Sequence, residues 1–167
     1  LQASAVALES HPAIAYFQAL ADETKTWLLA GSMAIAAGDG RAANRSVLID
    51  PDGVVTATYD KIHMFDVQVG DGATYRESHT YEPGTEAVLA ATPWGPLGMT
   101  ICYDIRFPAL YRTLAQAGAG MVTAPAAFTQ VTGQAHWHVL QRARAIENGA
   151  FIISAAQTGT HAEGRQT

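Results

Sequence analysis

The strongest structural signal in the sequence lies in Leu97-Gly-Met-Thr-Ile-Cys-Tyr-Asp-Ile-Arg-Phe-Pro108. Its apolar first half predicts a strand, and its last two residues open an amphipathic helix that we expect to end at Ala117, before Gly118. Cys102 therefore stands where a strand passes into a helix. The backbone N–H groups of such a turn favour a thiolate and a neighbouring oxyanion.

The N-terminal part predicts one helix followed by strands. Apolar residues at three- and four-residue spacing favour a helix over 12–25, with Pro12 in its first turn. The apolar run 27–37 predicts a buried strand. Residues 46–50 and 54–59 are rich in β-branched side chains and are joined by Pro51-Asp52-Gly53, so they predict an antiparallel hairpin.

The rest of the chain alternates strands and helices around one irregular segment. We expect an irregular segment over 65–84, a hairpin of 86–92 with 97–102, strands over 121–124 and 151–156, the latter buried, and a helix over 135–148. Hairpins mixed with strand-helix-strand units predict a layered α/β protein with a mixed sheet covered by helices.

Composition limits the architecture and the partners. A chain of 167 residues with 49% hydrophobic and 15% charged residues can bury one core, which indicates a single domain. Its net charge of -5 and lack of basic clusters argue against nucleic acid. The longest uncharged stretch, 113–141, contains Pro125 and many polar residues, so no membrane span is expected. With one cysteine there is no internal disulfide, which suits a cytoplasmic, reducing compartment.

Three residues suggest nucleophilic chemistry only when they are taken together. Cys102 alone is either a nucleophile or a buried inert thiol. Lys61, which directly follows the second hairpin strand, would lower a nearby thiol pKa and donate to an oxyanion, although a solvated lysine is the ordinary explanation. Glu77 alone would be a surface carboxylate or a partner of Arg76.

Histidine and arginine supply the alternatives. Six histidines make a Cys-His enzyme conceivable, but Cys102 lacks papain-like or caspase-like flanks and the Gly-x-nucleophile-x-Gly motif. His136 and His138 are two residues apart on a predicted helix, which argues against a shared metal. Arg106 either holds the cysteine turn or binds a substrate carboxylate.

A family resemblance follows from four motifs in order. They are Tyr59-Asp-Lys-Ile-His63, Gly98 to Pro108 as quoted above, Ala143-Arg-Ala-Ile-Glu-Asn148, and Ala155-Ala-Gln157 continuing to His161. The sequence resembles the nitrilase superfamily of carbon–nitrogen hydrolases over nearly its whole length. Within that superfamily it is most similar to the Nit branch of amidases.

The resemblance implies a four-layer αββα sandwich with mixed sheets and a Glu-Lys-Cys triad. Cys102 would be the nucleophile, Lys61 and the backbone N–H of Tyr103 would hold the oxyanion, and Glu77 would orient the lysine. The family's general-base glutamate would precede Leu1, and further strands would follow Thr167. We therefore expect one incomplete domain over 1–167, truncated at both ends and unstable alone.

The resemblance also implies an activity and partners. We expect amide hydrolysis through a cysteine thioester, without metal or organic cofactor, on deaminated glutathione or a related small ω-amide. Arg106 and Phe128 would contact the substrate, and a homodimer would form through the helix over 107–117. Two alternatives remain open, a non-catalytic interaction module of the same fold and a cysteine acyltransferase.

Overall fold

The computed structural model describes residues 5–38, 40–68, 72, 74–161 and 164–167. Its N-terminal half begins with a 3-10 turn, η2 (Leu8–Ser10), and the helix α1 (Pro12–Thr24). The helix confirms the prediction for this region. His11 caps it, since its Nδ1 atom accepts from the Ala13 N–H at 3.3 Å.

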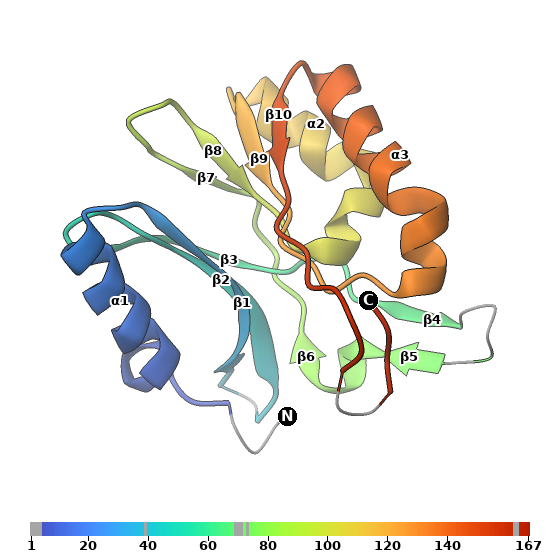
Figure 1. Ribbon diagram of the computed structural model, residues 1–167, viewed down its shortest axis with the longest axis horizontal. Coiled ribbons are helices and arrows are strands. Elements are labelled where there is room, and N and C mark those ends of the chain that lie inside the picture. Colours follow the sequence, from blue (N-terminus) through green and yellow to red (C-terminus); the bar gives the residue numbers. More distant parts are fainter. Residues whose placement is uncertain (1–4, 39, 69–71, 73, 162–163) are drawn as a thin grey trace.

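The first sheet lies under α1 and is built mainly of antiparallel neighbours (Figure 1). Its strands are β1 (Leu28–Ala36), β2 (Ala42–Ile49), β3 (Val55–Asp60) and the short β6 (Tyr81–Glu82), which pairs parallel to β2. The hairpin of β2 with β3 confirms the predicted one, although β2 begins four residues earlier. Ile14 and Ala21 of α1 pack on Val47 and Ile49 of this sheet.

The second sheet has the order β10-β9-β8-β7. Its strands are β7 (Val88–Ala90), β8 (Leu97–Met99), β9 (Met121–Thr123) and β10 (Phe151–Ile153), and only β7 with β8 is antiparallel. The helices α2 (Pro108–Gln116) and α3 (Gln130–Asn148) cover its outer side (Figure 1). Buried Tyr111 and Leu114 of α2 contribute to that core, together with Val122 of β9.

A third apolar cluster joins the two sheets face to face. Leu48 and Tyr59 of the first sheet pack with Ala90, Met99 and Ile101 of the second. The order of layers is therefore α1, first sheet, second sheet, α2 with α3. This confirms the four-layer αββα sandwich with mixed sheets.

The segment predicted to be irregular contains short regular elements. The described part of 65–84 forms a hairpin of β4 (Asp66–Gln68) with β5 (Thr74–Arg76), the 3-10 turn η3 (Glu77–His79) and β6, while 69–71 and 73 lie outside the described residues. Asp66 fixes this fold, because it accepts from the Ser78 N–H at 3.0 Å and from the Ser78 hydroxyl at 2.6 Å. Strands of two or three residues carry too little periodicity for detection from sequence.

Two further predictions need correction. The strand at 151–156 ends at Ile153 and is not buried, since Phe151 is 77% and Ile153 51% exposed on the edge strand β10. Helix α3 starts at Gln130 rather than Ala135, because Thr129 adopts an extended N-cap conformation that allows an earlier start despite Gly133. Among the described residues, no helix combines the length and apolarity needed to cross a membrane.

Candidate active site

Cys102 occupies a strained turn between the second sheet and α2. The chain reaches it through Thr100, whose N–H donates to the Thr123 carbonyl at 3.1 Å, and the Cys102 N–H donates to the Pro125 carbonyl at 2.9 Å. Cys102 begins the 3-10 turn η4 (Cys102–Arg106) with φ +48°. A non-glycine residue in this left-handed region is uncommon, and such strained residues cluster at active sites. The sequence carried no glycine motif that would announce this turn.

A buried carboxylate locks the cysteine turn to the lysine segment. Asp104 is fully buried and accepts from the Tyr59 hydroxyl at 2.7 Å and the Ile101 N–H at 2.9 Å. Its other oxygen accepts from the His63 N–H at 3.0 Å and lies 2.7 Å from His63 Nδ1. Sequence reasoning did not single out Asp104, although an acid between apolar neighbours signals a buried partner.

Lys61 extends from the end of β3 and is buried, with 3% exposure. Its N–H donates to the Asn44 carbonyl at 2.9 Å, and its carbonyl accepts from the Gly84 N–H at 2.8 Å. The ammonium forms an ion pair with Glu77, with Nζ 2.5 Å from Oε2. Backbone hydrogen bonds to Asn44 and Gly84 therefore fix the main chain of Lys61, from which the side chain extends into the cavity.

Glu77 is the centre of a polar cluster rather than a surface carboxylate or a partner of Arg76. Besides Lys61, its Oε2 atom accepts from the Phe65 N–H at 2.6 Å, and Oε1 accepts from the Asn44 amide at 3.0 Å. Asn44 lies in β2, Lys61 directly follows β3 and Phe65 directly precedes β4. These three hydrogen bonds therefore hold the Glu77 carboxylate against the lysine. Asn44 was not predicted as a site residue.

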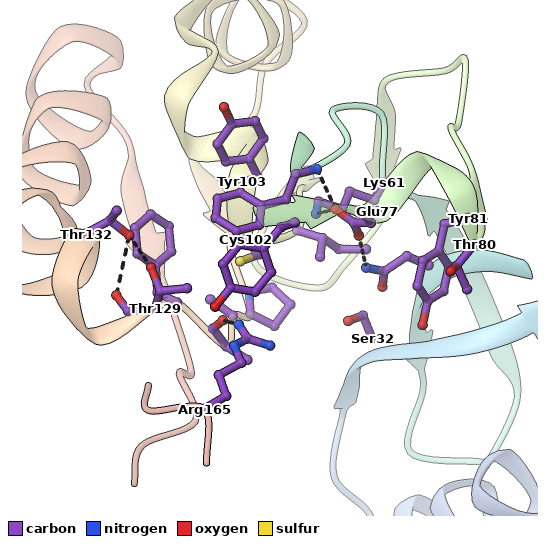
Figure 2. A pocket seen from close by; sticks show the side chains of 18 of the residues that line it. Ser32, Lys61, Glu77, Thr80, Tyr81, Cys102, Tyr103, Thr129, Thr132 and Arg165 are labelled. Carbon is purple, nitrogen blue, oxygen red and sulfur yellow. Dashed lines mark hydrogen bonds and ion pairs between the residues drawn. The ribbon is translucent and has the colours of Figure 1, made fainter. Parts of the chain in front are cut away.

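Cys102, Lys61 and Glu77 lie around one cavity of about 360 Å³, and Figure 2 draws most of its side chains. Its lining comes from the first sheet, the cysteine turn and the C-terminal segment, as Figure 2 shows for Ser32, Cys102 and Arg165. The described lining comprises Ser32, Asn44, Lys61, Phe65, Tyr75, Arg76, Glu77, Thr80, Tyr81, Ile101, Cys102, Tyr103, Pro125, Ala126, Ala127, Phe128, Thr129, Thr132 and Arg165. The structure thus brings together the three residues that the sequence could link only through resemblance.

The remaining predicted residues divide between the cavity and its surroundings. Tyr103 and Phe128 line it, whereas Arg106 is not among its described lining residues. The Arg106 guanidinium lies over the Phe128 ring, 5.2 Å from its centroid, and 3.4 Å from the ring Nδ1 of His136. The Tyr103 N–H follows Cys102 directly, in the same turn of η4.

Burial controls the protonation of the nucleophile candidate. Removal from water raises the pKa of the Cys102 thiol, and the Glu77 carboxylate raises it further. The Lys61 ammonium, the Ala127 N–H and the Arg165 guanidinium oppose this shift without overcoming it. The expected lowering by lysine and backbone therefore exists but loses to desolvation, so the thiol is protonated at neutral pH.

No histidine among the described residues is placed to act as a base for Cys102. The described lining of the cavity contains no histidine. His63 pairs with Asp104 and stacks on Phe107 at 3.6 Å between ring centroids, behind the cysteine turn. Within the described ranges, no group of three His, Cys, Asp or Glu side chains is arranged to hold a metal.

Arg165 is a cavity residue that the sequence did not indicate. It comes from the C-terminal segment, where the bond of the His161 N–H to the Arg165 carbonyl at 2.8 Å closes a small loop. Its side chain reaches towards Cys102 in Figure 2, from a different side than Lys61 and Glu77. The sequence around Arg165 has no local pattern that would place this arginine in a site.

Comparison with known proteins gives related sequences that include several deaminated glutathione amidases. The chain is 50% identical over 144 residues to the deaminated glutathione amidase of Yersinia enterocolitica, covering 84% of this chain and 50% of that protein. It is 45% identical over 170 residues to the deaminated glutathione amidase of a Synechocystis strain, covering 99% of this chain and 61% of that protein. The chain thus spans between half and two thirds of these relatives.

Solved structures agree with the sequence relatives. The NitFhit protein of C. elegans superimposes with a TM-score of 0.87 at 40% identity, over 93% of this chain and 39% of that one. Nit3 of Saccharomyces cerevisiae, a member of branch 10 of the nitrilase superfamily, gives 0.81 at 29% identity, over 92% of this chain and 54% of that one. The carbon-nitrogen hydrolase family model matches residues 2–167. The chain therefore belongs to the carbon-nitrogen hydrolase family, within the nitrilase superfamily.

Proposed function

We propose that the protein containing this chain hydrolyses the amide bond of a small molecule, with Cys102 as nucleophile. One observation carries the proposal, namely that a buried Lys61 ammonium, held by Glu77 at 2.5 Å, shares a cavity with the Cys102 thiol. A cation fixed before substrate arrives stabilises the oxyanion without reorganisation. Membership of the carbon-nitrogen hydrolase family supports the same chemistry.

The proposed reaction has two steps, acylation of Cys102 and hydrolysis of the thioester. In the first, the Cys102 sulfur attacks the amide carbon, the thiol proton passes to the leaving nitrogen through a base, and ammonia departs from a thioester. In the second, water attacks the thioester, the thiol is regenerated and a carboxylic acid is released. Lys61 and the Tyr103 N–H would stabilise the oxyanion in both steps.

A general base is needed because burial keeps the Cys102 thiol protonated. Glu77 is the one carboxylate among the described lining residues, and its oxygens already accept from Lys61, Asn44 and Phe65. We propose that Glu77 positions the lysine and that the base is a second glutamate of the whole protein, as the family resemblance implies. This assignment gives Glu77 an electrostatic and orienting role.

The proposed substrate is a small ω-amide such as deaminated glutathione. Two relatives at 45–50% identity are named for that activity. A cavity of about 360 Å³ lies at the lower end of the usual volume of small-molecule sites, which supports a compact substrate arm. We further propose that the protein works in the cytoplasm, where the one cysteine of this chain stays reduced, and forms a homodimer through the 107–117 region.

Replacement of Cys102 by Ala tests the proposal in the full-length gene product. We expect loss of ammonia release from deaminated glutathione and loss of the acyl-enzyme mass detected by intact-protein mass spectrometry. Glu86→Gln, at an exposed acid outside the cavity, is the matched control and should retain activity. Turnover by Cys102→Ala near the parent rate would remove the cysteine from the mechanism. Product analysis with hydroxylamine present would distinguish hydrolysis from acyl transfer.

A further inference from the structure

The last turns of α3 carry a motif that has no part in the proposed reaction. Ala143-Arg-Ala-Ile-Glu-Asn148 lies outside the described lining of the cavity. Its Arg144 is nevertheless buried, with 6% exposure. A buried guanidinium needs partners, because removing its charge from water without them is costly. The partners of Arg144 therefore show what the motif holds.

The Arg144 guanidinium binds the end of the cysteine turn. Its Nε atom donates to the Ile105 carbonyl at 2.8 Å, in the same 3-10 turn η4 that Cys102 begins. The last carbonyls of a helical turn have no partner inside it, and an arginine near that end can cap them. Asp104 binds the beginning of the turn, where it accepts from the Ile101 N–H at 2.9 Å. A buried charged side chain therefore binds each end of the turn that carries the nucleophile.

The same guanidinium is linked to the segment that leads into the turn. Its Cζ atom lies over the Tyr111 ring, 5.7 Å from the centroid. A cation over an aromatic face is attracted by the ring, and more strongly away from water. The Tyr111 hydroxyl lies 2.7 Å from the hydroxyl of Thr100, which precedes Cys102 by two residues. Arg144 thus contacts the chain directly after Cys102 and through one tyrosine before it.

Two neighbours on α3 hold the arginine in this position. Glu147 lies one helical turn further along, and its Oε1 atom accepts from Arg144 Nη1 at 2.8 Å. The Asn148 amide donates to the Arg144 carbonyl at 2.9 Å. Glu147 therefore orients the guanidinium, and Asn148 adds a side-chain hydrogen bond to the backbone of the arginine.

The strain at Cys102 makes these contacts relevant to the reaction. A non-glycine residue at φ +48° persists only where surrounding contacts over-determine it. The Tyr103 N–H, which is proposed to bind the oxyanion, belongs to the same turn, and such a donor acts through its fixed geometry. We propose that Arg144 is a positioning residue, which holds the cysteine turn from α3 so that the Tyr103 N–H meets the oxyanion. This inference rests on the proposed amidase function for the part that concerns turnover.

The first test compares Arg144→Lys with Arg142→Lys in the full-length gene product. Lysine keeps the charge but has no planar group to bind Ile105 and Glu147 together. Arg142 is an exposed arginine of the same helix and should tolerate the change. For Arg144→Lys, we expect kcat for the amide to fall about 10-fold or more, with KM within about 2-fold of the parent. An unchanged kcat in Arg144→Lys would overturn the inference.

Two reactions of the thiol give a readout independent of turnover. Methyl methanethiosulfonate forms a disulfide with the Cys102 sulfur and releases methanesulfinate, without an oxyanion, so its rate should be alike in the parent and both lysine variants. Butyraldehyde adds reversibly, because the sulfur bonds to the carbonyl carbon and the thiol proton passes to the oxygen at the oxyanion position. We expect its protection of Cys102 from the thiosulfonate to require about 10-fold or more aldehyde in Arg144→Lys alone.

The outcomes separate this inference from the amidase function. Weaker aldehyde protection in Arg144→Lys, in a protein that releases no ammonia, would support the positioning role and contradict the amidase function. Equal protection in the parent and Arg144→Lys would overturn the inference even in an active amidase. Equal losses of thiosulfonate rate and aldehyde protection would also overturn it, since they would show a general collapse of the site.

A second variant keeps the inference testable if Arg144→Lys does not fold. Glu147→Gln leaves the arginine in place but removes the charge that orients it. We expect weaker aldehyde protection in Glu147→Gln as well, by less than in Arg144→Lys, with an unchanged thiosulfonate rate. Protection equal to the parent in a folded Glu147→Gln protein would overturn the inference. Circular dichroism and thermal unfolding confirm that folded proteins are compared.

Discussion

Asp104 and Arg165 are charged residues close to the same thiol, but their hydrogen bonding is opposite. Both oxygens of fully buried Asp104 are engaged, by Tyr59, Ile101 and His63. Arg165 is half-buried, and its Nε atom has no hydrogen-bond partner among the residues that the structure describes. The difference teaches that the described residues satisfy both carboxylate oxygens on one side of the site and leave one buried donor unsatisfied on the other. Substitutions on the two sides should therefore affect different measurements.

The largest effect is expected from Asp104→Ala, which removes the satisfied carboxylate. It would leave the buried donors of Tyr59, Ile101 and His63 without their acceptor, and we expect the free energy of unfolding to fall by about 3–5 kcal/mol. Urea unfolding of the full-length protein measures it. Glu86→Gln, at an exposed acid outside the cavity, should cost less than about 1 kcal/mol. Equal losses in the two variants would show that Asp104 does not lock the cysteine turn to the lysine segment.

Glu77→Gln weakens the ion pair with Lys61 while keeping the shape of the side chain. Glutamine can accept from one neighbour but cannot neutralise Lys61, so we expect kcat/KM for the amide to fall about 100-fold. Steady-state ammonia release measures the change. The Glu86→Gln control should stay within about 2-fold of the parent, as is usual for an exposed charge. Activity near the parent value in Glu77→Gln would refute the positioning role of this carboxylate.

Gly84→Ala acts on the lysine through the backbone. A Cβ atom at Gly84 would lie 2.2 Å from the Asp60 carbonyl oxygen, directly before Lys61 in the chain. The backbone must move, and we expect a loss of about 1–3 kcal/mol in the free energy of unfolding. At Gly120 a Cβ atom meets nothing within 4 Å, so Gly120→Ala is the matched control. Differential unfolding of the two variants decides whether this close approach matters.

The same contrast explains how far the sequence alone leads. Local patterns predicted α1, the hairpin of β2 with β3 and α2, because their periodicity and turn residues act over a few neighbours. The motifs around Lys61 and Cys102 indicated the family. Asp104 and Asn44 could not be assigned, since their roles depend on side-chain partners 33 to 45 positions away that only the folded sheets bring together.

The sequence pattern also failed to predict how exposed the side chains of the last strand are. The apolar run that begins at Phe151 has the composition of a buried strand, yet it forms a sheet edge with two exposed side chains. An apolar composition shows that a strand can be buried, but whether it is buried depends on which elements pack beside it. Arg106 and Arg165 illustrate the same limit, because their distance along the chain from Cys102 does not indicate which one lines the cavity.

The smallest effect is expected on the pKa of the Cys102 thiol, which Lys61 and Arg165 approach from different sides of the cavity. Burial raises the pKa of Cys102, so the pH profile of its alkylation by iodoacetamide should have a midpoint above that of an unfolded control peptide. Lys61 is the largest of the opposing influences and Arg165 the smallest. Lys61→Met should therefore move the midpoint to still higher pH, and Arg165→Gln should move it in the same direction by less. A larger displacement in Arg165→Gln than in Lys61→Met would reverse the assignment, making the C-terminal arginine the principal electrostatic partner of the thiol and the lysine a structural cation.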